Sequence, residues 1–443
     1  IKQMAWERTG DRSIRICTVR DREEIASLAN KCSGATGEKP ILANFLELIS
    51  IKIVPEHLAG DLNSRTINSP EPYLNRFPVG TGPYKFAGAE TGVLSLVSNT
   101  DYYGKIPSIS QIKFKLFKTE EQANTALQNG EIHSLATSST EYSRQNGGYP
   151  QVLVNKSPVL QNQYWAVYFN LRKNPDGEAL GPEFFQDVTV RRAISSAVNR
   201  QKILENLDNV GVEAKGPIST LSEFYNPNAG EYDYDVSVAN QLLDEAGWNV
   251  RDGDGIRIKD GDRMSFKLSY VDNYDRNKIA RSIKEDLAVV GVELELDKRD
   301  LGDLTTTIVT PKLFDTLLYG MNTFVDPDRY ELFHSTQSGK LNLSSYIGSD
   351  LTRKVEGRDL VDVPRVDKLL EQGRSFDPLD AKDKRRETYD RVQELIAADA
   401  PVIFLYQPQF IYYTNKRLQN VDLSGVSNLE QRFRNIASWT LVE

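Results

Sequence analysis

The sequence predicts an α/β fold that is divided into more than one lobe. Helical and strand patterns alternate from about residue 80 onward, which favours α/β lobes over a helical bundle or a β-sandwich. With 443 residues, the chain is too long for one ordinary hydrophobic core. Its proline- and glycine-rich loops, at residues 147–150, 174–177 and 226–227, are too short to be free linkers. We therefore expect short crossovers between the lobes.

Helices are predicted by apolar residues at helical spacing and by the residues that begin or end such runs. Asp187 and Asp235 each stand where they can N-cap the helix that follows. Gly130, Gly247 and Gly291 stand where a left-handed residue would end a helix. The predicted helices cover residues 120–130, 187–198, 235–247, 279–290 and 389–396.

Strands are predicted where apolar residues alternate or run continuously. Such segments lie at residues 292–296, 314–319 and 402–406, the last two as continuous apolar runs of the kind found in buried strands. The second of these strands leads into a short helix, which we expect at residues 328–334, with Asp326 as its N-cap and Pro327 after it.

Composition and charge exclude some classes of protein. The chain has 39% hydrophobic and 26% charged residues, and no run approaches the ~20 apolar residues that a membrane-spanning helix needs. A formal net charge of −8 disfavours nucleic acid as a partner, because binding phosphates requires a concentrated basic surface. Lys382, Lys384, Arg385 and Arg386 form a short basic cluster that is mixed with acids, and we interpret it as a solvated helix face.

Residues suited to catalysis or metal binding are few. The three histidines, His57, His133 and His334, are far apart in the sequence, so no Ser-His-Asp or Cys-His arrangement can be assembled with them. Cys17 and Cys32 are too few for a zinc site, and the sequence leaves open whether they are free thiols or form one disulfide. We expect no catalytic residues, no metal and no cofactor.

Two glycine-containing segments resemble ligand loops but favour turns. Residues 80–82 look like the start of a dinucleotide fingerprint, yet Lys85 stands where the third glycine is needed. We expect a tight turn that feeds a strand, with Gly80 and Gly82 supplying positive φ. Residues 252–255 suggest a calcium loop, but a β-hairpin turn explains them better.

Six segments, taken in order, resemble the family 5 extracellular solute-binding proteins of ABC importers, which take peptides, nickel and oligosaccharides. The resemblance runs from about residue 45 to residue 439. Any one motif would be weak, but six in the family's order are specific. They are IVPEHL at 53–58, PVGTGPYKF at 78–86, NTDYY at 99–103, ANTALQNGEIH at 123–133, FQDVTVRRAI at 185–194 continuing to Asn199 and Arg200, and LLDEAGW at 242–248.

The resemblance implies a two-lobe fold similar to the periplasmic binding proteins of type II, peptide-binding subclass, with mixed sheets and a hinge. Lobe I would comprise residues 1–165 and a C-terminal return at 407–443, and lobe II residues 166–406. Family members usually carry more residues ahead of the first motif, so the chain is either a fragment or has a reduced first lobe. Within the fifth motif, we expect Arg191, Arg192 and Arg200 to pair with carboxylates such as Asp187.

The solute is expected in the cleft between the lobes. Residues 320–328 follow a buried strand, and loops after such strands bind ligands in open α/β sheets. An aromatic strand at 161–170 resembles the family's crossover, and alternation sends Tyr164 and Tyr168 to one face and Trp165 to the other. The predicted solute contacts are Tyr164, Trp165, Tyr168, Gly320, Met321, Asn322, Thr323, Phe324, Asp326, Asn342 and Tyr346.

One departure from the family concerns the amine of a bound peptide. Peptide-binding members hold it with an acidic residue a few positions after the glycine that corresponds to Gly320. Here residues 321–324 carry no acid, and the first one, Asp326, falls in the predicted helix cap. Recognition of a free amino terminus is therefore not expected.

The resemblance also implies partners and a location. The chain would be a monomer that captures a small-molecule or oligopeptide solute outside the cytoplasm and delivers it to the permease subunits of an ABC importer. It would act in the periplasm or at the outer face of the cytoplasmic membrane, with lipid anchoring through a segment outside this sequence left open. Three alternatives remain: the same fold binding an oligosaccharide or a metal chelate, a surface protein that has lost transport, and a hydrolase.

Overall fold

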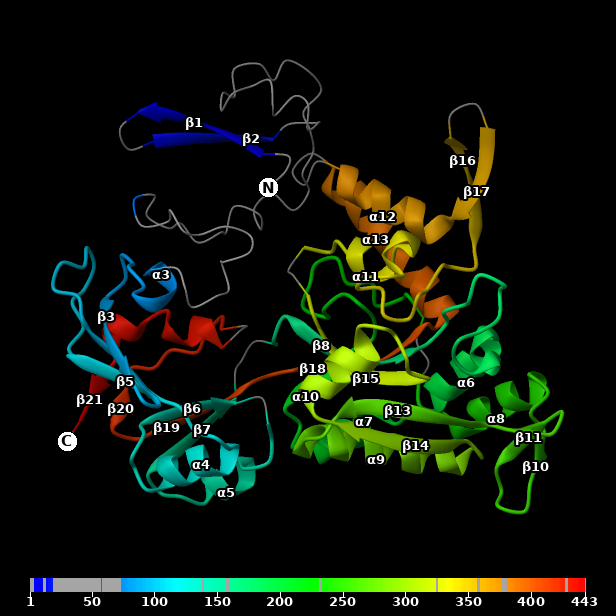
Figure 1. Ribbon diagram of the computed structural model, residues 1–443, viewed down its shortest axis with the longest axis horizontal. Coiled ribbons are helices and arrows are strands. Elements are labelled where there is room, and N and C mark those ends of the chain that lie inside the picture. The colour runs from blue at the N-terminus through cyan, green and yellow to red at the C-terminus, as the bar shows by residue number, and fades with distance from the viewer. Residues whose placement is uncertain are drawn as a thin grey trace.

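The computed structural model describes residues 4–10, 13–18, 57, 73–137, 139–156, 160–230, 233–323, 326–356, 359–376, 381–426 and 429–442. These residues form two bodies with separate sheets, which lie side by side in Figure 1. The predicted α/β class is confirmed, since strands and helices alternate through the larger body. No helix of the described residues is long and apolar enough to span a membrane.

The larger body is built on a mixed six-stranded sheet. Its strand order is β14-β13-β15-β8-β18-β9. The bounds are β8 (Gln163–Phe169), β9 (Gly211–Glu213), β13 (Ser265–Val271), β14 (Glu293–Arg299), β15 (Thr316–Asn322) and β18 (Val402–Pro408). β13 runs parallel to β14 and β15, while β8 is antiparallel to both β15 and β18. As a result, β13, β14, β15 and β18 all end at the same edge of the sheet.

Two hydrophobic cores cover the opposite faces of this sheet. Val167 and Phe169 belong to one core, and Tyr164 and Tyr168 belong to the other, which confirms the alternation predicted for this strand. The first core packs against α6 (Val188–Ala197), α7 (Arg200–Asn206), α8 (Val236–Glu245) and α9 (Tyr274–Val289). The second packs against α12 (Arg365–Ser375) and α13 (Lys382–Asp399).

The smaller body contains two three-stranded sheets. One has the order β3-β4-β5, with β3 (Tyr84–Glu90), β4 (Val93–Ser98) and β5 (Gln111–Lys115). The other has the order β6-β19-β7, with β6 (Ser134–Thr137), β7 (Val152–Lys156) and β19 (Ile411–Asn415). Around them lie α3 (Tyr73–Arg76), α4 (Glu120–Gln128), α5 (Ser143–Gly147) and the pair β20 (Leu418–Gln419) and β21 (Thr440–Leu441).

Short elements complete the described residues. The paired strands are β1 (Met4–Gly10) with β2 (Ser13–Thr18), β10 (Val250–Arg251) with β11 (Arg257–Lys259) and β12 (Asp262–Arg263), and β16 (Leu351–Glu356) with β17 (Asp359–Pro364). The short helices are η2 (Glu183–Gln186), α10 (Leu301–Asp303), η3 (Leu304–Val309), α11 (Tyr330–Phe333), η4 (Ser335–Gln337), η5 (Glu430–Phe433) and η6 (Ile436–Ser438).

The predicted helix boundaries are confirmed where a local cap sets them. Asp187 accepts a hydrogen bond from the backbone of the residue two positions on, and Asp235 accepts two from the first turn of α8. Gly130, Gly247 and Gly291 follow their helices with φ of 74°, 86° and 79°. These are the left-handed values that glycine adopts without steric cost.

The prediction of a helix at residues 328–334 is wrong at its start. The helix, α11, begins at Tyr330, and its N-cap is Arg329, not Asp326. Both carboxylate oxygens of Asp326 accept from Nη2 of Arg385, at 2.7 and 2.9 Å. The interpretation of the basic cluster as a solvated face is therefore also wrong for Arg385, which is 2% exposed.

The expectation that the motif arginines pair with carboxylates is largely wrong. Arg191 donates to the backbone carbonyls of Phe185, Gln186 and Asp399, and Arg192 donates to the carbonyl of Ala398. The last two carbonyls end α13, where no intrahelical donor remains and a positive charge is favourable. The two arginines thus fix the end of α13 against α6.

The glycines of the second motif do not supply positive φ. Neither Gly80 nor Gly82 lies in the left-handed region, so that expectation is wrong, and the chain bends at residues 81–83 before β3. Asn99 of the third motif donates from its side chain to the Gly82 carbonyl at 2.9 Å, and its backbone donates to Pro83 at 2.8 Å. Two motifs that are separated in sequence therefore hold one turn together.

Candidate functional site

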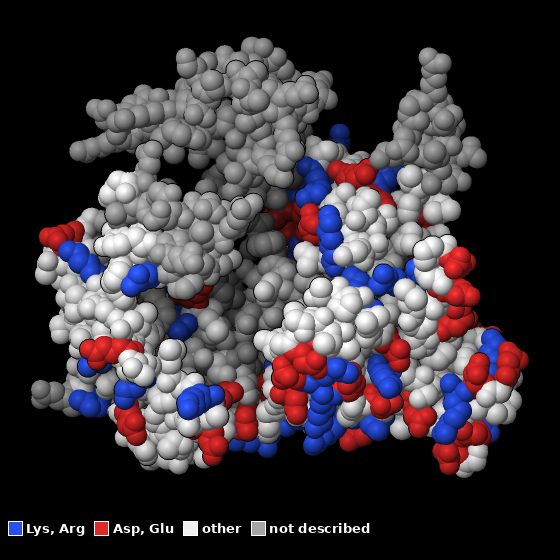
Figure 2. Space-filling model, in the orientation of Figure 1, with Lys and Arg blue, Asp and Glu red and all other residues white. Residues whose placement is uncertain are grey.

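The candidate site lies at the edge of the large sheet where its parallel strands end. Gln163, the first residue of β8, pairs with Asn322, the last residue of β15. Both connections between the two bodies leave from this edge, one from β7 to β8 and one from β18 to β19. The carboxyl ends of parallel strands are where open α/β sheets bind ligands. Figure 2 shows that acidic and basic side chains are mixed over the described surface of both bodies.

Trp165 lies on this edge against Gly320, its partner in the β8–β15 pairing. A Cβ atom added to Gly320 would lie 2.7 Å from Cζ2 of Trp165 and 2.7 Å from Nε2 of Gln163. Real Cβ atoms do not approach other atoms so closely, so a glycine is required for the indole to lie across β15. Trp165 stays partly exposed.

Arg276 covers the face of this indole. Its guanidinium carbon lies 3.7 Å from the centre of the Trp165 ring, a cation–π contact. Asn273 places it, because the Asn273 side chain caps α9 by accepting from the backbone N–H of Arg276 at 3.0 Å. The Nε of Arg276 is buried and has no hydrogen-bond partner among the described residues. The edge therefore carries a guanidinium stacked on an aromatic ring, with one buried donor that has no partner among the described residues.

Hydrogen bonds connect the two bodies next to this edge. Asp275, in the first turn of α9, accepts from the Thr140 hydroxyl at 2.7 Å and from its backbone N–H at 3.1 and 3.2 Å. Burial raises the pKa of Asp275, although the bonds from Thr140 oppose that shift. Asp208 accepts from Ser143 at 2.5 Å and from Arg144 at 2.9 Å. Burial alone would raise the pKa of Asp208, but these bonds outweigh it and lower the pKa.

Several predicted site residues lie elsewhere. Tyr164 and Tyr168 are 1% and 3% exposed, and their rings are covered by the second core. Asn342 and Tyr346 lie at the other edge of the sheet, because the loop between them joins Leu171, just beyond the end of β8, through a backbone hydrogen bond to Ser344. The structure therefore favours Trp165 over the buried tyrosines as a solute contact and does not bring Asn342 or Tyr346 near it.

The end of β15 and the residue after it are only partly accessible. The predicted strand bounds of 314–319 are wrong, because β15 runs to Asn322 and so places Gly320, Met321 and Asn322 in the strand and not in a loop. Asn322 is exposed, whereas Met321 and Thr323 are buried, and the Thr323 N–H donates to the Asn162 carbonyl at 2.8 Å. Phe324 lies outside the described residues. Asp326 is occupied by Arg385, as described above. Among the predicted residues, Trp165, Gly320 and Asn322 therefore form the accessible part of this edge.

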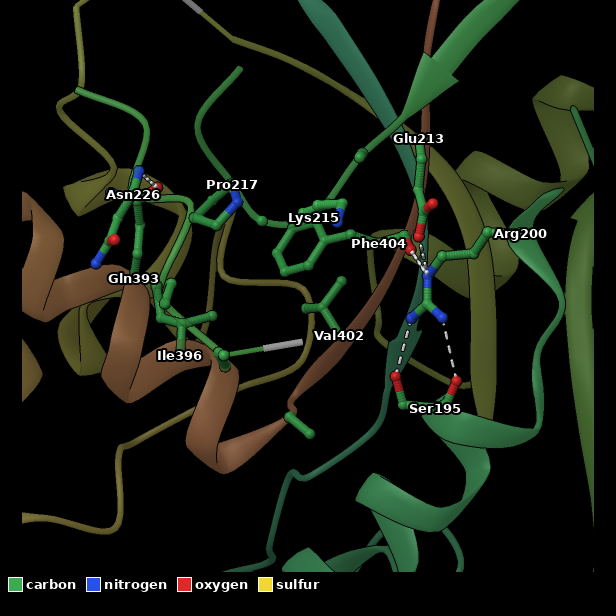
Figure 3. Close-up of a pocket in the computed structure, with 16 residues that line it drawn as sticks. Ser195, Arg200, Glu213, Lys215, Pro217, Asn226, Gln393, Ile396, Val402 and Phe404 are labelled. Atoms are coloured by element: carbon green, nitrogen blue, oxygen red, sulfur yellow. Dashed lines mark hydrogen bonds and ion pairs between the residues drawn. The ribbon is translucent and has the colours of Figure 1, made fainter. Parts of the chain in front are cut away.

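A small cavity in the larger body has a structural role. It lies between α13, β18 and the loop after β9 and has a volume of about 40 Å³, room for no more than a few water molecules (Figure 3). Arg200 extends along it and donates to the carbonyl of Phe404 at 2.7 Å and to the carbonyl and hydroxyl of Ser195 at 3.2 and 3.0 Å. Glu213 lies 3.8 Å away. These contacts join α6, α7 and β18.

Sequence reasoning missed the residues that accompany Trp165. Arg276 and Asp275 precede the apolar stripe at residues 279–290 from which the helix was predicted, and α9 begins at Tyr274. The capping type of Asn273 is the one local signal, and it indicates where a helix starts, not what its first turn contacts. Thr140 lies in an irregular loop and carries no signal.

Comparisons with protein families, with curated proteins and with solved structures all point to solute-binding proteins. Residues 36–341 match the family described as bacterial extracellular solute-binding proteins, family 5. The oligopeptide-binding protein AppA of Bacillus subtilis is 29% identical over 404 residues, which cover 89% of this chain and 68% of AppA. The structure of B. subtilis AppA in complex with a nonapeptide has a TM-score of 0.71 at 25% identity and covers 100% of this chain and 79% of that one.

A further solved structure shares the fold. NikZ from Campylobacter jejuni, in complex with Ni(L-His), has a TM-score of 0.70 at 23% identity, covering 90% of this chain and 75% of NikZ. The family match covers more than half of the sequence, and the six motifs and the α/β architecture in two bodies agree with it. The chain belongs to the bacterial extracellular solute-binding proteins of family 5.

Proposed function

We propose that this chain is the solute-binding component of a bacterial ABC importer and that it captures a peptide at the edge that carries Trp165. The observation that carries the proposal is the likeness, over the whole chain, to a structure of AppA that holds a nonapeptide. The protein acts outside the cytoplasm, in the periplasm or at the outer face of the cytoplasmic membrane. It hands the peptide to the permease without chemical change.

The two lobes close on the solute. Lobe I comprises residues 1–165 and 407–443, and lobe II comprises residues 166–406. The separate sheets of the two bodies support two lobes, because β3 to β7 and β19 lie in one and β8 to β18 in the other. The sheet of lobe II extends slightly beyond both proposed bounds, since β8 begins at Gln163 and β18 ends at Pro408. The connection between β18 and β19 passes through residues 409–410 alone, which is short enough to act as a hinge. Contacts that form only in the closed state favour closure.

The side chains at the edge suit a peptide. The indole of Trp165, which stays partly exposed under the guanidinium of Arg276, offers apolar surface, and the amides of Gln163 and Asn322 can donate to and accept from a peptide backbone. Arg276 supplies a cation for a carboxylate of the solute. Since backbone contacts do not depend on side-chain identity, selectivity among peptide sequences is broad.

The amino terminus of the peptide is not held by a carboxylate here. Asp326, the first acid after β15, is paired through both oxygens with the buried Arg385. Taking it away from Arg385 would leave a buried cation unpaired, which costs several kcal/mol. Acetylating a bound peptide should therefore change its affinity by less than about tenfold, or roughly 1.4 kcal/mol. A loss of a hundredfold on acetylation, measured by calorimetry, would show that a carboxylate does bind the amine.

A thermal-shift screen tests the solute class. The full chain is heated with pools of peptides, with oligosaccharides and with nickel–histidine complexes. Peptides should raise the melting temperature, because a ligand at about 100 times its Kd stabilises the folded state by roughly 2.7 kcal/mol. Stabilisation by another class alone, or steady hydrolysis of any of these compounds that persists through repurification, would contradict the proposal.

A further inference from the structure

A second, larger cavity opens at the opposite edge of the large sheet from Trp165. Its volume is about 750 Å³, within the roughly 300–1,000 Å³ of small-molecule sites. It lies beside Leu171, which follows the far end of β8. The charged side chains that line it are Arg172, Lys173, Arg191, Lys312 and Asp399. Four cations thus face one carboxylate, in a chain whose formal net charge is −8.

Lys312 is the buried member of this group. It is 5% exposed, and its ammonium donates to the backbone carbonyls of Ser338 and Asn342. An ammonium carries three N–H groups, so one is left for a ligand. No carboxylate of the described residues forms an ion pair with it, and the neighbouring charge that acts on it is the cation Arg172. The backbone of Lys312 has φ of 57°, a value that residues other than glycine rarely adopt.

The one carboxylate in the lining is already engaged. Asp399 accepts from the hydroxyl of Tyr346 at 2.6 Å and from the backbone and hydroxyl of Ser349. Its charge acts on Arg191, whereas the one charge of the described residues that acts on Lys312 is that of Arg172. Gln186, which also lines the cavity, has a buried Nε2 without a hydrogen-bond partner among the described residues. The cavity thus holds unused donors and excess positive charge.

We propose that this cavity binds a polyvalent oxyanion, with a phosphate group as the best fit, held by Lys312, Arg172 and the Gln186 amide. Arginine and lysine together are suited to phosphate, because the guanidinium donates through two parallel N–H groups and the ammonium acts as a point charge. The phosphate can be free, part of a small organic molecule, or a lipid headgroup. The cavity is separate from the edge that carries Trp165, where the peptide is proposed to bind and which we call the peptide edge. The proposal therefore does not rest on the proposed function.

The ionisation of Lys312 gives a second consequence. Burial, together with Arg172, lowers the pKa of Lys312 to about 8. A bound anion favours the charged form, so anion affinity should fall as the pH rises above about 8. The other titratable groups that face the cavity are Arg172, Lys173, Arg191, Tyr346 and Asp399. Sulfate is the probe for this measurement, because its own charge does not change between pH 7 and 9.5.

Calorimetric titration of the full chain at constant ionic strength tests the proposal. Inorganic phosphate and pyrophosphate should bind, and acetate should bind at least tenfold more weakly. Lys312→Met should weaken phosphate binding at least tenfold. The matched control Lys284→Met, at an exposed position of α9, should leave it unchanged. Vesicles of phosphatidylglycerol, compared with phosphatidylcholine, show whether the phosphate can come from a lipid.

A milder variant keeps the test meaningful if Lys312→Met fails to fold. Lys173 is exposed, and Lys173→Gln should fold normally and weaken phosphate binding severalfold. Peptide affinity should not change in either variant, which separates this site from the peptide edge. Absence of phosphate and pyrophosphate binding at millimolar concentration, or equal binding by the wild type and the folded Lys312→Met protein, would overturn the proposal.

Discussion

At the scale of single residues, Gly320 decides whether Trp165 can lie at the edge. The replacement Gly320→Ala places a methyl group 2.7 Å from the indole and from the Gln163 amide, so one of them must move. Overpacking of this kind costs roughly 1–3 kcal/mol. We expect Gly320→Ala to lower the stability in urea denaturation by that amount and to weaken peptide binding. Gly339→Ala is the control, because no atom lies within 4 Å of its Cβ position. Equal behaviour of the two variants would contradict the packing described here.

The burial of Asp275 affects how the stability of the protein depends on pH. Burial raises its pKa in the folded protein above the 3.8 of an unperturbed aspartate, so the folded state binds this proton more tightly than the unfolded chain. Stability from this group therefore rises as the pH falls from neutral toward 3.8, and the charged form is a cost at pH 7. Asp275→Asn removes that charge and keeps an acceptor for Thr140.

The stability of Asp275→Asn relative to the wild type should therefore be greater at pH 7 than at pH 4. Urea denaturation at the two pH values measures this difference. Thr140→Ala, which leaves the buried carboxylate with fewer donors, should instead destabilise the protein at pH 7 by about 1–3 kcal/mol. A relative stability of Asp275→Asn that is lower at pH 7 than at pH 4 would contradict the direction of the pKa shift.

At the scale of elements, the end of α13 depends on two arginines of α6. Arg191 is buried and donates to three backbone carbonyls, whereas the bonds of Arg192 lie at the surface. Arg191→Met leaves buried carbonyls without donors and should cost about 2–4 kcal/mol. Arg192→Met removes the same charge and should cost about 1 kcal/mol or less. Denaturant titration of both variants would refute the account if their losses were equal.

An element boundary can be predicted when the residues that fix it are close together in the sequence. The starts of α6 and α8 are predictable, because the caps Asp187 and Asp235 are adjacent in sequence to the first turns that they cap. The start of α11 is not, because Asp326 is taken by Arg385 from a helix that comes much later in the chain. The same contact buries an arginine whose local surroundings indicate a solvated face. A long-range partner thus caused both errors.

The candidate site shows the same limit. Strand alternation is enough to place Trp165 and Tyr164 on opposite faces, whereas Gly320, expected in a loop, lies inside β15, where it pairs with Trp165. Which face stays accessible depends on α12 and α13, which cover the tyrosines. Asn342 could not be placed by its position in the sequence, because its loop returns to the other end of β8.

At the scale of the whole molecule, the two bodies meet at one edge of one sheet. Short connections leave that edge, and Asp275 and Asp208 hold the neighbouring loop of the smaller body. The peptide edge and the cavity beside Lys312 lie at opposite ends of the same sheet. At the proposed site, a solute would contact the region through which any change in the relative orientation of the two bodies must pass.

The most direct measurement is a calorimetric titration of the full chain with a peptide identified in the thermal-shift screen. The wild type is compared with Trp165→Ala and with Tyr164→Phe, a buried neighbour on the other face of β8. We predict that Trp165→Ala weakens binding by more than about tenfold, or roughly 1.4 kcal/mol, and that Tyr164→Phe leaves it within about twofold. Equal affinities of the wild type and a folded Trp165→Ala protein would contradict the central claim that the peptide binds at this edge.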